Sequence, residues 1–114
     1  TGELCQCDQV GNCDQTCEGG NCQFKCAGRG NCKFNCPDGK CVVQNEATGN
    51  LTLDCAGGGC KINSSGTGNV VVDCAGGSCA VNCTGTGNCM IQSCSSGCTK
   101  ACSGTANCTC ASGC

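Results

Sequence analysis

The chain has 114 residues, of which 21 are Cys and 20 are Gly, but it has only two Phe, one Met and no Trp or Tyr. A chain so poor in bulky apolar side chains cannot build an ordinary hydrophobic core, so covalent cross-links are expected to supply much of its stability. The formal net charge is −2, and the six Lys and Arg residues lie singly along the chain, which argues against nucleic acid or an anionic membrane as a partner.

Cysteine at this density is typical of proteins that fold in an oxidising compartment outside the cytosol. The sequence therefore predicts an extracellular protein, either secreted or part of a cell-surface appendage. No apolar run approaches the roughly 20 residues of a membrane span, so we expect no membrane insertion. No signal peptide opens the sequence, which we interpret as that of a mature protein.

An internal repeat predicts the architecture. Asn recurs every 19 residues, and each of these Asn follows a Gly except the last, which follows Ala106. The repeating positions are Asn12, Asn31, Asn50, Asn69, Asn88 and Asn107. We expect one domain of six 19-residue turns, divided into a half-turn at 1–11, full turns at 12–30, 31–49, 50–68, 69–87 and 88–106, and a half-turn at 107–114.

Each repeat contains two short segments in which apolar or Cys residues alternate with polar ones, a pattern typical of strands. In chain order, the expected inward residues are Cys13, Gln15 and Cys17; Cys22, Phe24 and Cys26; Cys32, Phe34 and Cys36; Cys41, Val43 and Asn45; Leu51, Leu53 and Cys55; Cys60, Ile62 and Ser64; Val70, Val72 and Cys74; and Cys79, Val81 and Cys83. Two strands per turn in register predict an all-β fold, a two-sided parallel β-solenoid with a thin core and turns about 4.8 Å apart.

The repeat also predicts which cysteines pair. One corner of each turn suggests Cys17–Cys22, Cys36–Cys41, Cys55–Cys60, Cys74–Cys79 and Cys94–Cys98, and the opposite corner suggests Cys7–Cys13, Cys26–Cys32, Cys83–Cys89 and Cys102–Cys108. The second series fails twice, where Asn45 with Leu51 and Ser64 with Val70 occupy the paired positions. Both members of a pair are replaced together each time, as residues joined by a bond should be.

Three cysteines remain outside these nine pairs: Cys5, Cys110 and Cys114. An odd cysteine in an oxidised protein indicates a free thiol or an intermolecular bond. Our hypothesis is an intermolecular disulfide from Cys5 to Cys110 or Cys114. The alternative is that Cys110 and Cys114 pair with each other while Cys5 is free or capped.

The ends of the chain suggest a partner. The half-turns 1–11 and 107–114 together make one 19-residue turn, and neither carries an evident cap, so the last half-turn of one molecule could be completed by the first half-turn of a copy. Such a head-to-tail contact does not close on itself and generates a filament. The leading functional expectation is therefore an extracellular structural protein that self-assembles. Val71 and Met90 on one face, and Val42 and Ala80 on the other, are either lateral contacts between filaments or isolated apolar residues on the surface.

In its plan of short turns stapled by internal disulfides, the sequence resembles the cysteine-rich β-solenoid antifreeze proteins of beetles. That resemblance implies ice binding as an alternative function. The family's regular Thr-Cys-Thr array is absent, because the expected outward pairs are mixed, as in Lys33 with Asn35 and Val71 with Asp73. A partial column of threonines stands at one corner, at Thr48, Thr67, Thr86 and Thr105.

Thiolate binding of soft metals is a third possibility, although spacings of four to six residues between cysteines fit disulfides better. We expect no enzyme and no cofactor, since the chain has no His and its carboxylates are spread over outward positions and turns. Four N-x-S/T sequons occur, at Asn50, Asn63, Asn82 and Asn107. Asn63 and Asn82 should point outward and are the better acceptors for a glycan.

Overall fold

The computed structural model describes residues 12–103 and 107–111 completely and residues 4–7 by their backbone. These residues form twelve strands and no helix. The strands are β1 Leu4–Cys7, β2 Cys13–Thr16, β3 Gln23–Cys26, β4 Cys32–Asn35, β5 Val42–Asn45, β6 Leu51–Asp54, β7 Lys61–Ser64, β8 Val70–Cys74, β9 Ala80–Cys83, β10 Cys89–Cys94, β11 Thr99–Cys102 and β12 Cys108–Cys110.

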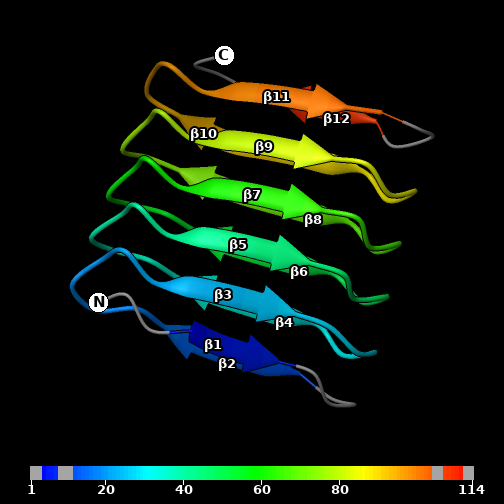
Figure 1. Cartoon of the computed structure of the whole chain (residues 1–114). Helices are drawn as coiled ribbons and strands as arrows, with labels where there is room; N and C mark the ends of the chain where they lie inside the picture. The colour runs from blue at the N-terminus through cyan, green and yellow to red at the C-terminus, as the bar shows by residue number, and fades with distance from the viewer. Residues whose placement is uncertain (1–3, 8–11, 104–106, 112–114) are drawn as a thin grey trace.

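The strands form two parallel six-stranded sheets that face each other, as Figure 1 shows. One sheet contains the odd-numbered strands in the order β1-β3-β5-β7-β9-β11, and the other contains the even-numbered strands in the order β12-β10-β8-β6-β4-β2. Partner residues lie 19 apart, for example Phe24 opposite Val43 and Phe34 opposite Leu53. The predicted all-β, two-sided parallel solenoid with a 19-residue repeat is confirmed.

The core is a thin layer between the sheets, and the molecule extends over 35 × 33 × 16 Å. Alternation along each strand sends every second side chain inward, so that Phe24, Val43, Ile62 and Val81 form one buried column and Phe34, Leu53, Val72 and Ile91 form another. The only two aromatic residues of the sequence, Phe24 and Phe34, stack with their ring centroids 4.2 Å apart. Cysteines occupy the inward positions on both sides of these columns.

The corner that follows each even-numbered strand, which we call the tight corner, needs backbone conformations that glycine adopts best. Gly39 has φ +79°, and its amide donates to the carbonyl of Cys36 at 3.2 Å. A Cβ at this position would lie 2.4 Å from the carbonyl oxygen of Gly58 in the next turn. Stacked turns therefore leave no room for a side chain here, which explains much of the glycine content.

The turn that contains β10 departs locally from the repeat. The register of β10 against β8 shifts between Ile91 and Ser93, which marks a β-bulge. The tight corner after β10 compensates, because Cys94 and Cys98 are four residues apart, whereas the corresponding cysteines elsewhere are five apart. One residue inserted in the strand and one removed from the corner keep β11 in the 19-residue register, with Thr99 opposite Ala80.

Candidate functional site

Disulfides close the tight corner in five successive turns. The bonds are Cys17–Cys22, Cys36–Cys41, Cys55–Cys60, Cys74–Cys79 and Cys94–Cys98. The opposite corner, which follows each odd-numbered strand and which we call the wide corner, is bridged by Cys26–Cys32, Cys83–Cys89 and Cys102–Cys108. These eight bonds join the same residues as eight of the nine predicted pairs. The ninth pair requires Cys7, whose side chain lies outside the described residues, although Cys13 is disulfide-bonded.

The tight-corner disulfides stack into a continuous ladder of sulfur atoms. In each successive pair of turns, three cysteine sulfurs lie within 4.8 Å of one another, as in Cys36, Cys55 and Cys60. Soft metals bind thiolates, but these sulfurs are joined in disulfides. In the oxidised protein the ladder therefore acts as a covalent staple, and thiolate ligands would form only after reduction.

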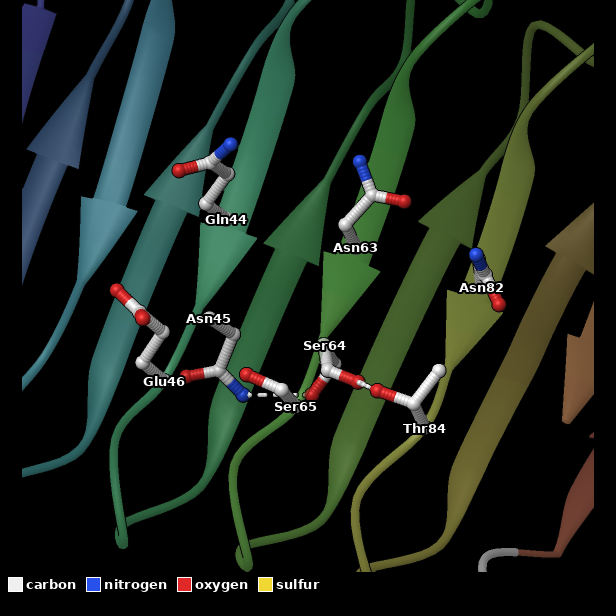
Figure 2. A pocket seen from close by; sticks show the side chains of 8 residues that line it. All are labelled: Gln44, Asn45, Glu46, Asn63, Ser64, Ser65, Asn82 and Thr84. Atoms are coloured by element: carbon white, nitrogen blue, oxygen red, sulfur yellow. Dashed lines mark hydrogen bonds between the residues drawn. The ribbon is translucent and has the colours of Figure 1, made fainter. Parts of the chain in front are cut away.

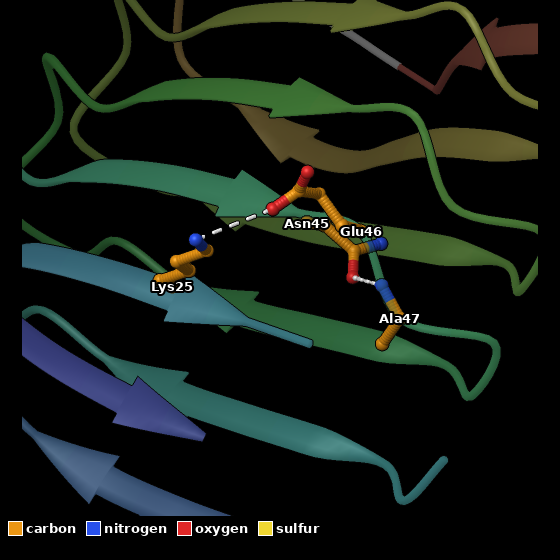
Figure 3. A network of polar contacts seen from close by, with 4 residues as sticks. All are labelled: Lys25, Asn45, Glu46 and Ala47. Carbon is orange, nitrogen blue, oxygen red and sulfur yellow. Dashed lines mark hydrogen bonds and ion pairs between the residues drawn. The ribbon is translucent and has the colours of Figure 1, made fainter. Parts of the chain in front are cut away.

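A buried hydrogen bond replaces the disulfide at the wide corner where two turns lack cysteine. Asn45 and Ser64 are only 1% and 5% exposed, and Asn45 Nδ2 donates to Ser64 Oγ at 3.0 Å. The backbone N–H of Ala47 donates to Asn45 Oδ1 at 3.2 Å, as Figure 3 shows beside the exposed Lys25–Glu46 ion pair. Leu51 and Val70, which take the places of the partner cysteines across the wide corner, are buried. The missing cross-links are thus exchanged for a polar contact that runs along the stack.

The recurring Asn residues form a ladder on the outside of the wide corner. The backbone N–H of four of these residues donates to the side-chain oxygen of the Asn in the preceding turn. The bonds run from Asn31 to Asn12 at 3.3 Å, from Asn50 to Asn31 at 2.8 Å, from Asn69 to Asn50 at 2.9 Å and from Asn88 to Asn69 at 3.0 Å. The carbonyls of the same residues accept from the preceding turn, as in Cys32 N–H to Asn50 O at 2.9 Å. The Asn residues that recur every 19 positions therefore tie successive turns together by hydrogen bonds.

A polar groove of about 220 Å³ crosses β5, β7 and β9 where these strands enter the wide corner. Figure 2 shows its two rows, with the amides of Gln44, Asn63 and Asn82 in one and Glu46, Ser65 and Thr84 in the other. Asn63 and Asn82 are exposed, and they lie opposite each other in the register of β7 and β9. The groove thus contains both of the outward sequons.

The outer faces carry no regular threonine array among the described strands. The outward column that contains Thr52 continues with Val71 and Met90, and the one that contains Asp54 continues with Asp73. Thr48, Thr67 and Thr86 are exposed at the wide corner, and Thr105 lies outside the described residues. The faces are chemically mixed, unlike the ice-binding array of the beetle proteins.

The two ends of the solenoid differ from its interior because polar residues enter the central core columns there. In the even-numbered sheet, Gln15 of β2 lies opposite Phe34 and is half-buried. In the odd-numbered sheet, Lys100 of β11 lies opposite Val81 and is exposed. Neither the role of Lys100 nor its place in the core column was recognised from the sequence, although counting back in steps of 19 leads from Lys100 to Val81, Ile62, Val43 and Phe24.

Two of the three leftover cysteines lie on strands at opposite ends of the solenoid. Cys5 of β1 lies opposite Phe24, and Cys110 of β12 lies opposite Ile91. Cys110 is disulfide-bonded within this single chain, so an intermolecular bond through it would require exchange of the existing one. The side chain of Cys5 and all of Cys114 lie outside the described residues.

Two further findings bear on the class of protein. The described residues contain no helix long and apolar enough to cross a membrane. The many disulfides are compatible with a secreted or extracellular protein. Comparison of the chain with protein-family models, with curated proteins and with solved structures found no match, so the fold and the disulfide pattern carry the functional interpretation.

Proposed function

We propose that this protein is an extracellular structural protein, the subunit of a filament in which solenoids stack end to end. The observation that carries the proposal is that, among the described residues, two strands at each end of the solenoid have a neighbouring strand on one side only. Strands β1 and β2 are the outermost strands at one end, and β11 and β12 are the outermost strands at the other. Edge strands present unpaired backbone groups that recruit further strands.

The two ends are complementary in register. Stacking would continue the odd-numbered sheet from β11 to β1 of a second copy and the even-numbered sheet from β12 to β2. All strands within each sheet are parallel, so a copy added in the same orientation extends both sheets at once. Because the surfaces that meet are different, the contact repeats without closing and gives a fibre.

The disulfides support a mechanical role rather than a catalytic one. Each staple closes a loop of only a few residues and contributes about 2 kcal/mol in the chain-entropy model, and such staples recur in every turn from β2 to β12. Among the described residues, the large apolar side chains Val42 and Met90 are 37% and 44% exposed and offer contacts for lateral bundling, while Val71 and Ala80 are half-buried.

Electron microscopy of the unreduced protein tests the proposal. We expect thin filaments with an axial repeat of about 29 Å, six strand spacings of about 4.8 Å. A variant that blocks one edge supplies the control. Cys13 and Cys17 direct their N–H groups toward β4, by donating to Asn31 O and Asn35 O, so by alternation the N–H of Asp14 points to the open side of β2.

Asp14→Pro removes this edge donor while leaving the internal pairing intact, and should abolish filaments. Asp14→Asn keeps the donor and should assemble like the parent protein. Monodisperse particles at all concentrations of the parent protein would refute the filament. Filaments formed equally well by Asp14→Pro would show that the contact does not use the sheet edges.

A further inference from the structure

A lysine ends the apolar column at one end of the core. Phe24, Val43, Ile62 and Val81 occupy this column in successive odd-numbered strands, and each is at most 3% exposed. Lys100 follows in β11, opposite Val81, and its side chain is exposed. The position is an inward one, so any strand added to β11 would cover Lys100.

The side chain of Lys100 bridges the two sheets at this end. Its ammonium donates to the carbonyl oxygen of Cys108 in β12, at an Nζ–O distance of 3.2 Å. Lys100 belongs to the odd-numbered sheet and Cys108 to the even-numbered sheet. The aliphatic stem therefore passes across the end of the core while the charged group remains in water.

We propose that Lys100 is the residue that controls end-to-end stacking: its charge opposes the addition of a second copy, so that removal of the charge strengthens the contact. This inference rests on the proposed filament. A copy stacked in register would place its Cys5 next to Lys100, because Cys5 occupies the same column beside Phe24. Across the core it would bring Gln15, which lies in the corresponding column beside Phe34.

Neither Cys5 nor Gln15 carries a carboxylate that could pair with the ammonium. A charge taken out of water without a partner is strongly unfavourable. Inward-pointing charges on edge strands are a recognised means by which β-proteins prevent uncontrolled addition of strands. Lys100 combines both features, since it lies on an edge strand and at an inward position.

The test compares the concentration at which filaments appear, measured by light scattering and electron microscopy, for the parent protein and three variants. Lys100→Val extends the apolar column, and we expect its threshold concentration to be at least tenfold lower. Lys100→Arg keeps the charge and should match the parent. Lys61→Val removes the same charge from an exposed, outward position of β7 in the same sheet, and should also match the parent.

An unchanged threshold for Lys100→Val, or an equal fall for Lys61→Val, would overturn the inference. A second measurement tests the role of Lys100 separately from the existence of the filament. Two complete copies are joined head to tail in one chain, and amide hydrogen exchange is followed in β11 of the first copy. Val at position 100 of that copy should slow exchange of the Cys102 amide at least tenfold relative to Arg.

If free Lys100→Val chains do not assemble but the joined copies show this protection, the filament is refuted and the role of Lys100 stands. If the joined copies with Val and Arg exchange equally fast, the role of Lys100 is refuted whether or not free chains assemble.

Discussion

The hydrogen bond between Asn45 and Ser64 offers the sharpest test of how the core is held where disulfides are missing. Asn45→Ala removes a side chain that is only 1% exposed and deprives two buried groups of their partners, the hydroxyl of Ser64 and the N–H of Ala47. Each buried polar group without a partner costs about 1–3 kcal/mol. We therefore expect the free energy of unfolding to fall by about 3 kcal/mol.

The assay is equilibrium unfolding in guanidinium chloride with the disulfides intact, carried out as a double-mutant cycle. Ser64→Ala alone leaves Asn45 Nδ2 without its acceptor and should cost about 1–2 kcal/mol. The double variant removes both members of the bond, so its loss should be smaller than the sum of the single losses by about 1 kcal/mol. Gln44→Ala, at the exposed neighbouring position, should change stability by less than about 0.5 kcal/mol. Strictly additive losses, or a loss for Asn45→Ala no larger than for Gln44→Ala, would refute the reasoning.

Three further predictions concern the corners and the groove. Gly68→Ala would place a Cβ 1.9 Å from the carbonyl oxygen of Gly49 and should cost about 2 kcal/mol or more. Gly59→Ala, whose nearest contact would be Lys40 Cγ at 3.5 Å, should cost about 1 kcal/mol from its positive φ, and equal losses in thermal unfolding would contradict the stacking argument. Asn50→Ala should lower the free energy of unfolding by about 1 kcal/mol in the same assay, because Asn50 Oδ1 accepts from the Asn69 N–H. Asn50→Asp keeps an acceptor and should lose less, so identical losses for the two variants would rule out the Asn ladder as a source of stability. When the chain is secreted from a glycosylating host, Asn63 and Asn82 should not both carry a glycan in one molecule, because they lie opposite each other on adjacent strands about 4.8 Å apart. Detection of molecules with both sites filled, by intact-mass spectrometry, would disprove this.

The disulfide pairing was predictable because the repeat reduces a large combinatorial problem to a comparison between turns. Cysteine is missing at Asn45 and at Leu51, which flank the same wide corner, and this identifies the two positions as one pair. The register follows from the same 19-residue period, since Phe24, Val43, Ile62 and Val81 must stack if the turns do. Small alternating segments specify strands poorly by themselves, and it is the repetition that made the prediction firm.

Other features depend on contacts that the period alone does not express. The Asn column indicates a recurrent position, but only coordinates show that each side-chain oxygen accepts from the next turn's backbone, as Asn31 Oδ1 does from Asn50. The bulge near Gln92 is only partly expressed in the period: Cys94 stands 20 residues after Cys74, and the shorter Cys94–Cys98 corner restores the 19-residue count at Cys98. The hydrogen bond between Asn45 and Ser64 was likewise not predicted, because the sequence marked these two residues only as positions where the repeat lacks cysteine.

Two kinds of departure from the repeat have opposite consequences for the molecule. Asn45 and Ser64 introduce polar groups into the middle of the stack, where they are buried and bonded to each other, so the chain satisfies them internally. Lys100 introduces a charge at an inward position of another column, on the outermost strand of its sheet, where the charge remains exposed and donates to Cys108 O. A departure in the middle acts on the stability of the fold, because its polar groups are buried and bonded within the stack. A departure at the edge affects whether a second copy can stack on the solenoid, because the strand that pairs with β11 must either bury the charge of Lys100 or not bind.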